Sequence, residues 1–597
     1  MKFPRLRIAL SASLLLLLAA PLFAQSPMPA MDMRPIPPPD QLPVPVRMTG
    51  IGNSHIAIKA TPEAQAWFDQ GLSLLHDFWN YESARAFEQA IRADPACAMC
   101  YWGLAQALGM RGDDVKAYTD RALAEAVRLK SKAGKSDRLY IDAAVAESRA
   151  KEGEKPYIAI YRKLVKLAPH DRQARIFLAN ALNDGYDDNG EPKAGAREAI
   201  AILESVLKDA PDDSAANHYW IHAMEPGLHP ELAIPSAARL ASLAPTSGHM
   251  VHMPGHIYYR VGDYASADRW FAASTAADER YLREQHVSVD DDWNYVHNLM
   301  YAIANLMEQG RLREAGALSD HLGAARGQLS HTLYIWSSRD QMSRISRRLP
   351  VALRTGDWSA VLTMLESSEL PAGEKTANLR FLRDELRRFA EGMRALDQGN
   401  LAAAQRASTE FDASLWRQDQ DAKLLEDESK SQPKAKPEAE PTKPAQLPLN
   451  PDAVLSPLIK TLSITSLELR AGILLLQGQL EPSKKLYTQA IAAEKKLGYR
   501  EPPFYIRPVA ETEGEAMLRA RHYTEARAAF QAALLERPAS GFELYGIARA
   551  DELAGHTAEA QSEYRDFLKA WPSADSELTE VVHAHAVVGE ANAVASK

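Results

Sequence analysis

A regular spacing of about 34 residues between matching side chains constrains this chain more than any other feature of its sequence. In the first copy, large residues at Trp67 and Phe87 alternate with small ones at Gly71 and Ala90, and Pro95 closes the stretch. This combination returns in whole or in part at residues 199–211, 233–245, 255–271, 522–538 and 555–572. A period of this length predicts repeated pairs of helices, in which large side chains fill the groove and small ones allow close approach.

The order and spacing of these residues resemble the tetratricopeptide repeat (TPR) family over most of the chain. From Thr61 onward, Ala, Leu and Glu dominate and no run of alternating β-branched residues is found, which favours helices throughout. The resemblance implies an all-α fold, an α-solenoid of TPR helix–turn–helix repeats with a concave groove.

The first 24 residues have the composition of a secretory signal peptide. Lys2, Arg5 and Arg7 form a basic start, the apolar run 14–18 follows, and Ala24 offers a small residue for cleavage. The apolar core is too short for a membrane anchor. We therefore predict a periplasmic or secreted protein with no membrane span in the mature chain.

The remaining sequence divides by composition into four parts. We expect an extended leader rich in Pro and Met at 25–60, an N-terminal and central TPR array at 61–416, a charged, proline-rich disordered linker at 417–457, and C-terminal repeats at 458–590. Lys and Arg number 69 against 78 Asp and Glu, a formal net charge of −9. This balance disfavours a nucleic-acid partner, because binding to phosphates needs a positive field.

The chain has two cysteines, Cys97 and Cys100. In an exported protein this pair predicts a local disulfide or a thiol pair, and a redox or metal role is the alternative.

Histidines cluster between residues 218 and 256, where six of the 17 in the chain are found. The interval from His218 to His252 equals that from His222 to His256 and matches the repeat period, so each pair occupies one slot in consecutive repeats. Residues four apart share a face of a helix. First helices of neighbouring repeats line the groove, so we expect these four imidazoles, together with His249 and Glu225, to converge on one patch there.

Neutral imidazoles are common ligands of transition metals. The sequence therefore predicts a metal site for copper, iron or zinc, with a dinuclear site as one option. We expect His218, His222, His252 and His256 as ligands. Three further residues are second candidates or a second shell: Glu225, His249 and His297.

Two prolines qualify this geometry. Pro254 removes a backbone hydrogen bond within a helix, so the helix is expected to start or kink there, with His249 and His252 on a preceding turn. Pro226 disfavours helical geometry at Glu225.

Three stretches, 94–103, 249–257 and 501–505, resemble a group of exported bacterial TPR proteins with an HxxHMPxHI-type segment. That resemblance implies fold and location and supplies no reaction. The sequence leaves three functions open: a scaffold with a metal-binding groove for a protein, peptide or small ligand; a metal-dependent enzyme, hydrolytic or redox; and a metal-free interaction adaptor.

Overall fold

A computed structural model describes residues 37–109, 115–151, 153–325, 338–370, 377–431, 451–499, 502 and 507–595 of the 597-residue chain. Within these ranges the protein is all-α, with 26 α-helices, four short 3-10 helices, and one isolated bridge in place of any strand. The all-α prediction is confirmed. The expected signal peptide, residues 1–24, lies outside the described residues.

The helices follow one another with short connections. The first fourteen are α1 (Pro62–His76), α2 (Asn80–Ala93), α3 (Ala98–Gly109), α4 (Lys116–Leu129), α5 (Lys135–Ser148), α6 (Tyr157–Leu167), α7 (Arg172–Leu182), α8 (Ala194–Asp209), α9 (Ser214–Met224), α10 (Ile234–Leu243), α11 (Gly248–Arg260), α12 (Tyr264–Gln285), α13 (Trp293–Glu308) and α14 (Leu312–Ala325). The others are α16 (Ser338–Ile345), α17 (Leu349–Thr355), α18 (Trp358–Glu366), α19 (Ala377–Asp397), α20 (Leu401–Ser431), α21 (Pro451–Leu476), α22 (Leu480–Lys495), α23 (Val509–Arg519), α24 (Tyr523–Glu536), α25 (Gly541–Ala554), α26 (Thr557–Ala570) and α27 (Thr579–Ala595). The 3-10 helices are η1 (Pro39–Gln41), η3 (Lys130–Lys132), η4 (Pro230–Ala233) and η5 (Val289–Asp291).

Consecutive helices pack on one another in pairs, among them α1 with α2, α11 with α12 and α25 with α26. The reason is the expected match of small and large residues. A Cβ added to Gly71 would lie 2.9 Å from the ring of Phe87 in the next helix, too close for a real Cβ. Gly255 and Phe271 repeat this contact at 2.4 Å. The TPR-type α-solenoid is therefore confirmed by its own packing.

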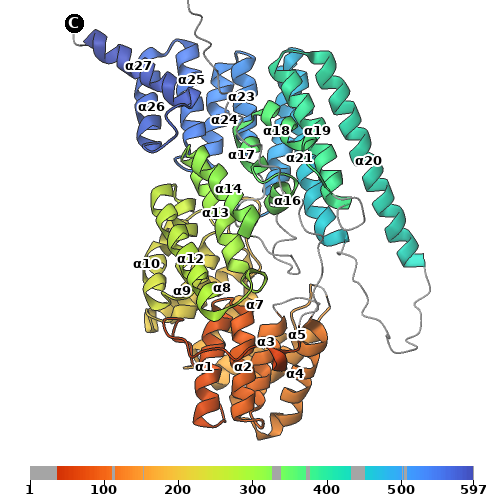
Figure 1. Ribbon diagram of the computed structural model, residues 1–597, viewed down its shortest axis with the longest axis vertical. Helices are drawn as coiled ribbons and strands as arrows, with labels where there is room; N and C mark the ends of the chain where they lie inside the picture. The colour runs from red at the N-terminus through yellow and green to blue at the C-terminus, as the bar shows by residue number, and fades with distance from the viewer. Residues whose placement is uncertain are drawn as a thin grey trace, which may run out of the picture.

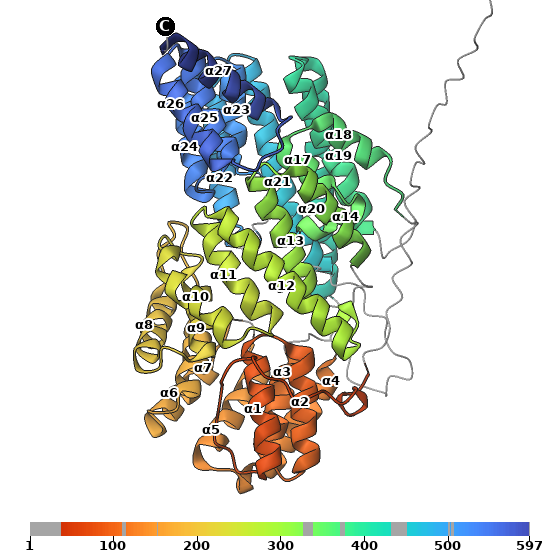
Figure 2. The same ribbon diagram turned by 60° about the vertical axis from the view of Figure 1, so that its left-hand side comes forward.

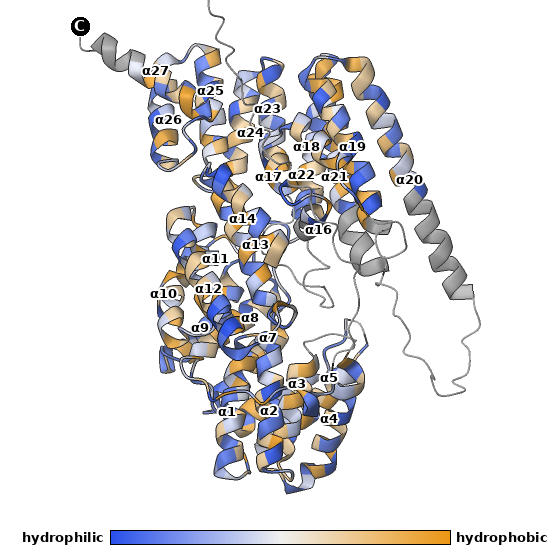
Figure 3. Cartoon of the chain, in the orientation of Figure 1, coloured by the Kyte–Doolittle hydropathy of each residue, from blue (hydrophilic) through white to orange (hydrophobic). Residues whose placement is uncertain are grey.

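The repeats form an elongated stack (Figure 1). Helices α1 to α5 lie at one end and α23 to α27 at the other, with α19, α20 and α21 along one side of the upper part. After a turn of 60°, α11 and α12 lie between the two ends (Figure 2). Apolar and polar residues alternate around the helices, as amphipathic packing requires (Figure 3).

The segment 37–60 ties the first repeats to later ones. Apart from η1 it is not helical, and Ile51 and Ile56 are buried. The backbone N–H of Asn53 donates to Ser214 Oγ at 3.0 Å, and the N–H of Thr246 donates to the carbonyl of Gly50 at 3.0 Å. The leader thus packs across helices that lie several repeats further along the chain.

Helices extend into both ends of the expected linker at 417–457. Helix α20 continues to Ser431 and α21 begins at Pro451. The residues between 418 and 430 contain no proline or glycine, so nothing in their sequence interrupts a helix. The proline-rich stretch 432–450 lies outside the described residues.

Candidate functional site: two histidine triads

Three first helices of consecutive repeats, α9, α11 and α13, carry the histidines, and α11 lies between the other two. Side chains fix where α9 and α11 begin, because Asp213 caps α9 by accepting from the N–H of Ala216 and Ser247 caps α11 by accepting from Met250. Pro254 lies inside α11, which continues from Gly248 to Arg260. We expected a helix that begins or kinks at this proline. The helix does not begin there, because α11 already starts at Gly248. His249, His252 and His256 all lie on this helix.

The first triad joins two helices. His218 and His222 on α9 and His249 on α11 each offer a ring nitrogen, and these three atoms lie within 4.8 Å of one another. His218 Nε2 and His249 Nε2 are 3.1 Å apart. Two ligands of one tetrahedral zinc ion, at bond lengths of about 2.0–2.1 Å, would be separated by about 3.3–3.4 Å. The spacing therefore fits two ligands of a single ion.

The second triad repeats the first one helix further on. His252 and His256 on α11 and His297 on α13 have ring nitrogens within 4.8 Å of one another. The Nε2 atoms of His252 and His256 are in close contact. Each triad is thus a pair of histidines four residues apart on one helix, completed by a histidine from the next first helix.

This arrangement divides the expected patch into two adjacent groups. Residues at equivalent positions of the two repeats, such as His218 and His252, belong to different triads. The two triads are therefore two copies of one site. His249 and His297, expected as second candidates, complete one triad each. Neither triad includes Glu225. The physical reason is that each repeat is displaced from the previous one by the same distance along the stack. Residues at equivalent positions therefore stay one repeat apart.

Contacts at Nδ1, the ring nitrogen that faces away from the triad, orient four of the histidine rings. His218 Nδ1 lies 2.6 Å from the carbonyl oxygen of His76, and His256 Nδ1 lies 2.8 Å from Glu225 Oε1. A backbone carbonyl only accepts hydrogen bonds, so His218 Nδ1 carries the proton. In the neutral ring of His218, Nε2 is then an unprotonated lone pair facing the triad.

Two asparagines of α13 orient two further rings. Asn294 donates from Nδ2 to Asp278 Oδ2 at 2.7 Å, so its Oδ1 is left to accept from His249 Nδ1 at 3.1 Å. Asn298 donates to Thr275 Oγ1 at 2.7 Å, and its Oδ1 accepts from His252 Nδ1 at 2.7 Å. Neither asparagine was among the residues predicted for the site, although both lie within three positions of His297. Fixing the far nitrogen in this way is typical of histidines that bind metals.

Burial keeps these rings neutral. His218, His252 and His256 have no exposed surface, and His249 is 4% exposed. Burial, followed by the neighbouring histidines, lowers the pKa of His218, His249 and His252 well below its ordinary value. Each triad also has one half-buried member, which is His222 in the first triad and His297 in the second.

Residues far away in sequence cover the triads. The ring of Phe78, in the turn between α1 and α2, stacks on His222 and on His249 with centroids 5.6 Å apart in both pairs. Trp293 lies 4.9 Å from His249, again between centroids. The turn carrying Phe78 thus folds over histidines that were expected to line a groove.

Glu225 closes the α9 end of the site. It keeps α-helical backbone angles at the end of α9 despite the following proline, contrary to expectation. Its Oε1 accepts from the hydroxyl of Tyr499, which comes from the loop after α22, and its Oε2 lies 3.8 Å from His222 Nδ1. The carboxylate therefore supports both triads from outside.

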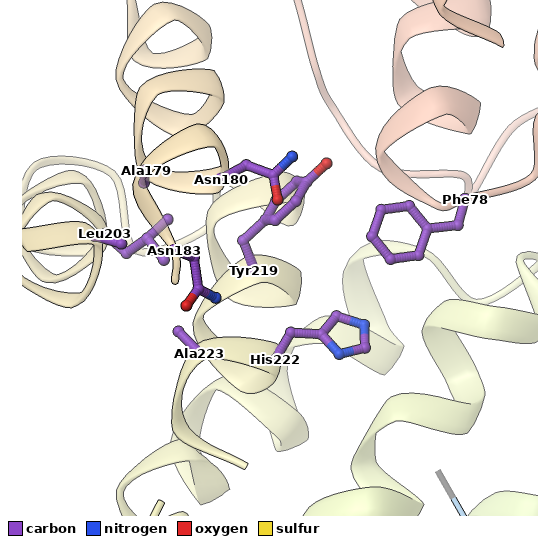
Figure 4. A pocket seen from close by; sticks show the side chains of 9 residues that line it. Phe78, Ala179, Asn180, Asn183, Leu203, Tyr219, His222 and Ala223 are labelled. Carbon is purple, nitrogen blue, oxygen red and sulfur yellow. The ribbon is translucent and has the colours of Figure 1, made fainter. Parts of the chain in front are cut away.

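A cavity of about 170 Å³ reaches the first triad (Figure 4). His222 and Phe78 form one part of its wall, and Tyr219 and Asn183 another. Figure 4 shows the His222 ring directed toward the side of the cavity where Phe78 lies. Of the six histidines, His222 is the one that lines this cavity.

Cys97 and Cys100 are joined by a disulfide at the start of α3. This confirms the local disulfide, one of the two bonding states expected for the pair.

Comparison with known proteins finds only distant structural similarity. No family model and no curated protein matches the chain. The solved structures that match include the human IFIT1 dimer with m7Gppp-AAAA, at 12% identity over 84% of this chain and 96% of that chain, with a TM-score of 0.33. Yeast Tom70 matches at 13% identity over 89% and 96%, with a TM-score of 0.26, and the TPR domain of P58(IPK) at 11% over 83% and 99%, with a TM-score of 0.18. Similarity this low carries no conclusion about ligands or partners.

Among the described residues, no helix is both long enough and apolar enough to span a bilayer.

Proposed function

We propose that this protein is an exported TPR-type scaffold whose two histidine triads bind a pair of transition-metal ions. The observation that carries the proposal is the pair His218 and His249. Each directs an Nε2 lone pair at the other across 3.1 Å, while each Nδ1 proton is held by an oxygen behind the ring. Two buried lone pairs that face each other repel unless a cation or a proton lies between them, and burial opposes the proton.

The ligand chemistry supports copper, iron or zinc over magnesium or calcium, because imidazole suits the former and oxygen ligands suit the latter. The disulfide supports an oxidising compartment, as expected from the basic and apolar start of the sequence. A protein or peptide partner belongs, in this proposal, on the surfaces of the solenoid outside the covered triads.

The test is elemental analysis of the full chain after export, and again after removal of metal and reloading with one metal at a time. We expect two ions per chain, one for each triad. His218→Ala and His297→Ala should each remove one ion, because each truncates a different triad.

His229→Ala is the matched control, because His229 lies in a turn outside the triads, where its side chain is 69% exposed. It should keep both ions. Asn298→Leu tests orientation without removing a ligand, and should weaken binding at the second triad about 10–100-fold. Less than one ion per chain in the folded wild type, or equal contents in all variants, would overturn the metal proposal and favour the metal-free adaptor.

A further inference from the structure

The ligand set of the two triads is neutral. All six side chains are histidines, and among the described residues no carboxylate belongs to either group. Glu225 lies behind His256, on the Nδ1 side of the ring, and not in a triad. The six ligands themselves therefore bring no negative charge to balance the ions that they would hold, and Glu225 is a carboxylate that contacts the site from outside.

Charge balance then favours the ion of lowest charge. The cost of burying an ion grows with the square of its charge, and His218, His252 and His256 have no contact with solvent. Two divalent ions would bring four positive charges into this site, whereas two cuprous ions bring two. Of the metals that favour imidazole ligands, copper is the one that readily forms a monovalent ion. Three imidazoles also satisfy a three-coordinate cuprous ion.

The two sites are close enough to act together. Across the triads, the rings of His249 and His252 are stacked with centroids 5.9 Å apart, and those of His222 and His256 are 6.2 Å apart. Two one-electron ions in adjacent sites can give two electrons to one acceptor.

The cavity beside His222 suits a small acceptor molecule, because its volume is about 170 Å³. Ala179, Ala199, Leu203 and Ala223 make much of its lining apolar. A small, uncharged molecule such as dioxygen fits both the volume and the lining.

We propose that the two triads hold a pair of cuprous ions that reduces dioxygen. This inference rests on the proposed metal site. Each ion gives up one electron and becomes cupric, dioxygen gains both electrons, and two protons from solvent complete hydrogen peroxide. The oxidised pair then carries two more positive charges than the cuprous pair, and hydroxide entering from the cavity beside His222 would offset them. One pair of ions thus reduces one dioxygen in a single turnover, and no further reactant is needed.

The experiment loads the full chain with cuprous copper without oxygen, measures the copper content, and then adds dissolved dioxygen. We expect two coppers per chain, consumption of one dioxygen per pair, and one hydrogen peroxide per pair by peroxidase assay. His297→Ala should keep the copper of the first triad and lose two-electron reduction, and with it the formation of hydrogen peroxide. His229→Ala should behave as the wild type.

The outcomes separate this inference from the metal proposal. Two zinc or iron ions per chain, with copper bound no better, would overturn the copper assignment and leave the metal site standing. Two coppers that yield no peroxide would likewise overturn the inference alone. Absence of every metal from the folded chain would overturn both.

Discussion

At the scale of the residue, the protein buries several histidines in the neutral form. His76 is fully buried against Phe177, and its backbone carbonyl accepts from His218. Burial lowers the pKa of its side chain to about 4, although Asp213 acts in the opposite direction. Unfolding returns this ring to water and to a pKa near 6.5.

The sign of the pH effect follows from these two values. The unfolded chain binds a proton at His76 below about pH 6.5, whereas the folded chain does not until about pH 4. Stability of the metal-free protein should therefore fall as the pH is lowered through this interval, with about 3 kcal/mol due to His76. Urea unfolding at several pH values measures this. His76→Leu should flatten the slope by one proton, and an unchanged slope would show that His76 titrates normally when folded.

At the scale of the element, repeated glycines set how closely paired helices approach. In the C-terminal repeats, a Cβ on Gly514 of α23 would lie 2.8 Å from the ring of Phe530 on α24. This is the contact that Gly71 makes with Phe87 in the first repeat. The glycine is therefore required by packing and not by backbone conformation, since it lies within a helix.

Gly514→Ala should destabilise the C-terminal repeats by about 1–3 kcal/mol, because Phe530 must move. The matched control is Gly589→Ala in α27, where nothing lies within 4 Å of the added atom. There alanine should stabilise by about 0.5–1 kcal/mol through helix propensity. Thermal unfolding of both variants measures the difference. Equal and small effects would mean that α23 and α24 are not packed this tightly.

At the scale of the whole molecule, a buried ionic network ties the C-terminal repeats to α13. Arg354 of α17, which is fully buried, pairs with Glu308 of α13 at 2.9 Å and with Glu511 of α23 at 2.8 Å. Arg537 also pairs with Glu308. Burial alone would raise the pKa of Glu308, but the two arginines outweigh it and lower the pKa. The helix that carries His297 is thus held at its other end by this network.

Arg354→Met should remove one ion pair from each of two buried carboxylates, Glu308 and Glu511, and lower the local free energy of opening by about 3–5 kcal/mol. Hydrogen exchange of α13 and α23 reads this directly. Arg348→Met, which removes a half-exposed pair with Asp320, should cost less than about 1 kcal/mol. Similar exchange in the two variants would contradict a structural role for the buried network.

The local sequence determined the helices and their pairing. Amphipathic patterning, capping residues such as Asp213 and small residues such as Gly255 act over one or two helical turns or one repeat, so a single sequence displays them. The repeat period also placed His218 and His252 in equivalent slots. For the same reason the fold could be predicted, and the site residues could be named.

Tertiary structure alone decided how these residues group and what covers them. His218 is oriented by a carbonyl 142 positions away, and Glu225 accepts from Tyr499, 274 positions away. No local pattern encodes contacts of that separation. They arise because the stack folds the turn of Phe78 and the loop of Tyr499 over α9 and α11, and this covers the two triads on a surface that was predicted to line a groove.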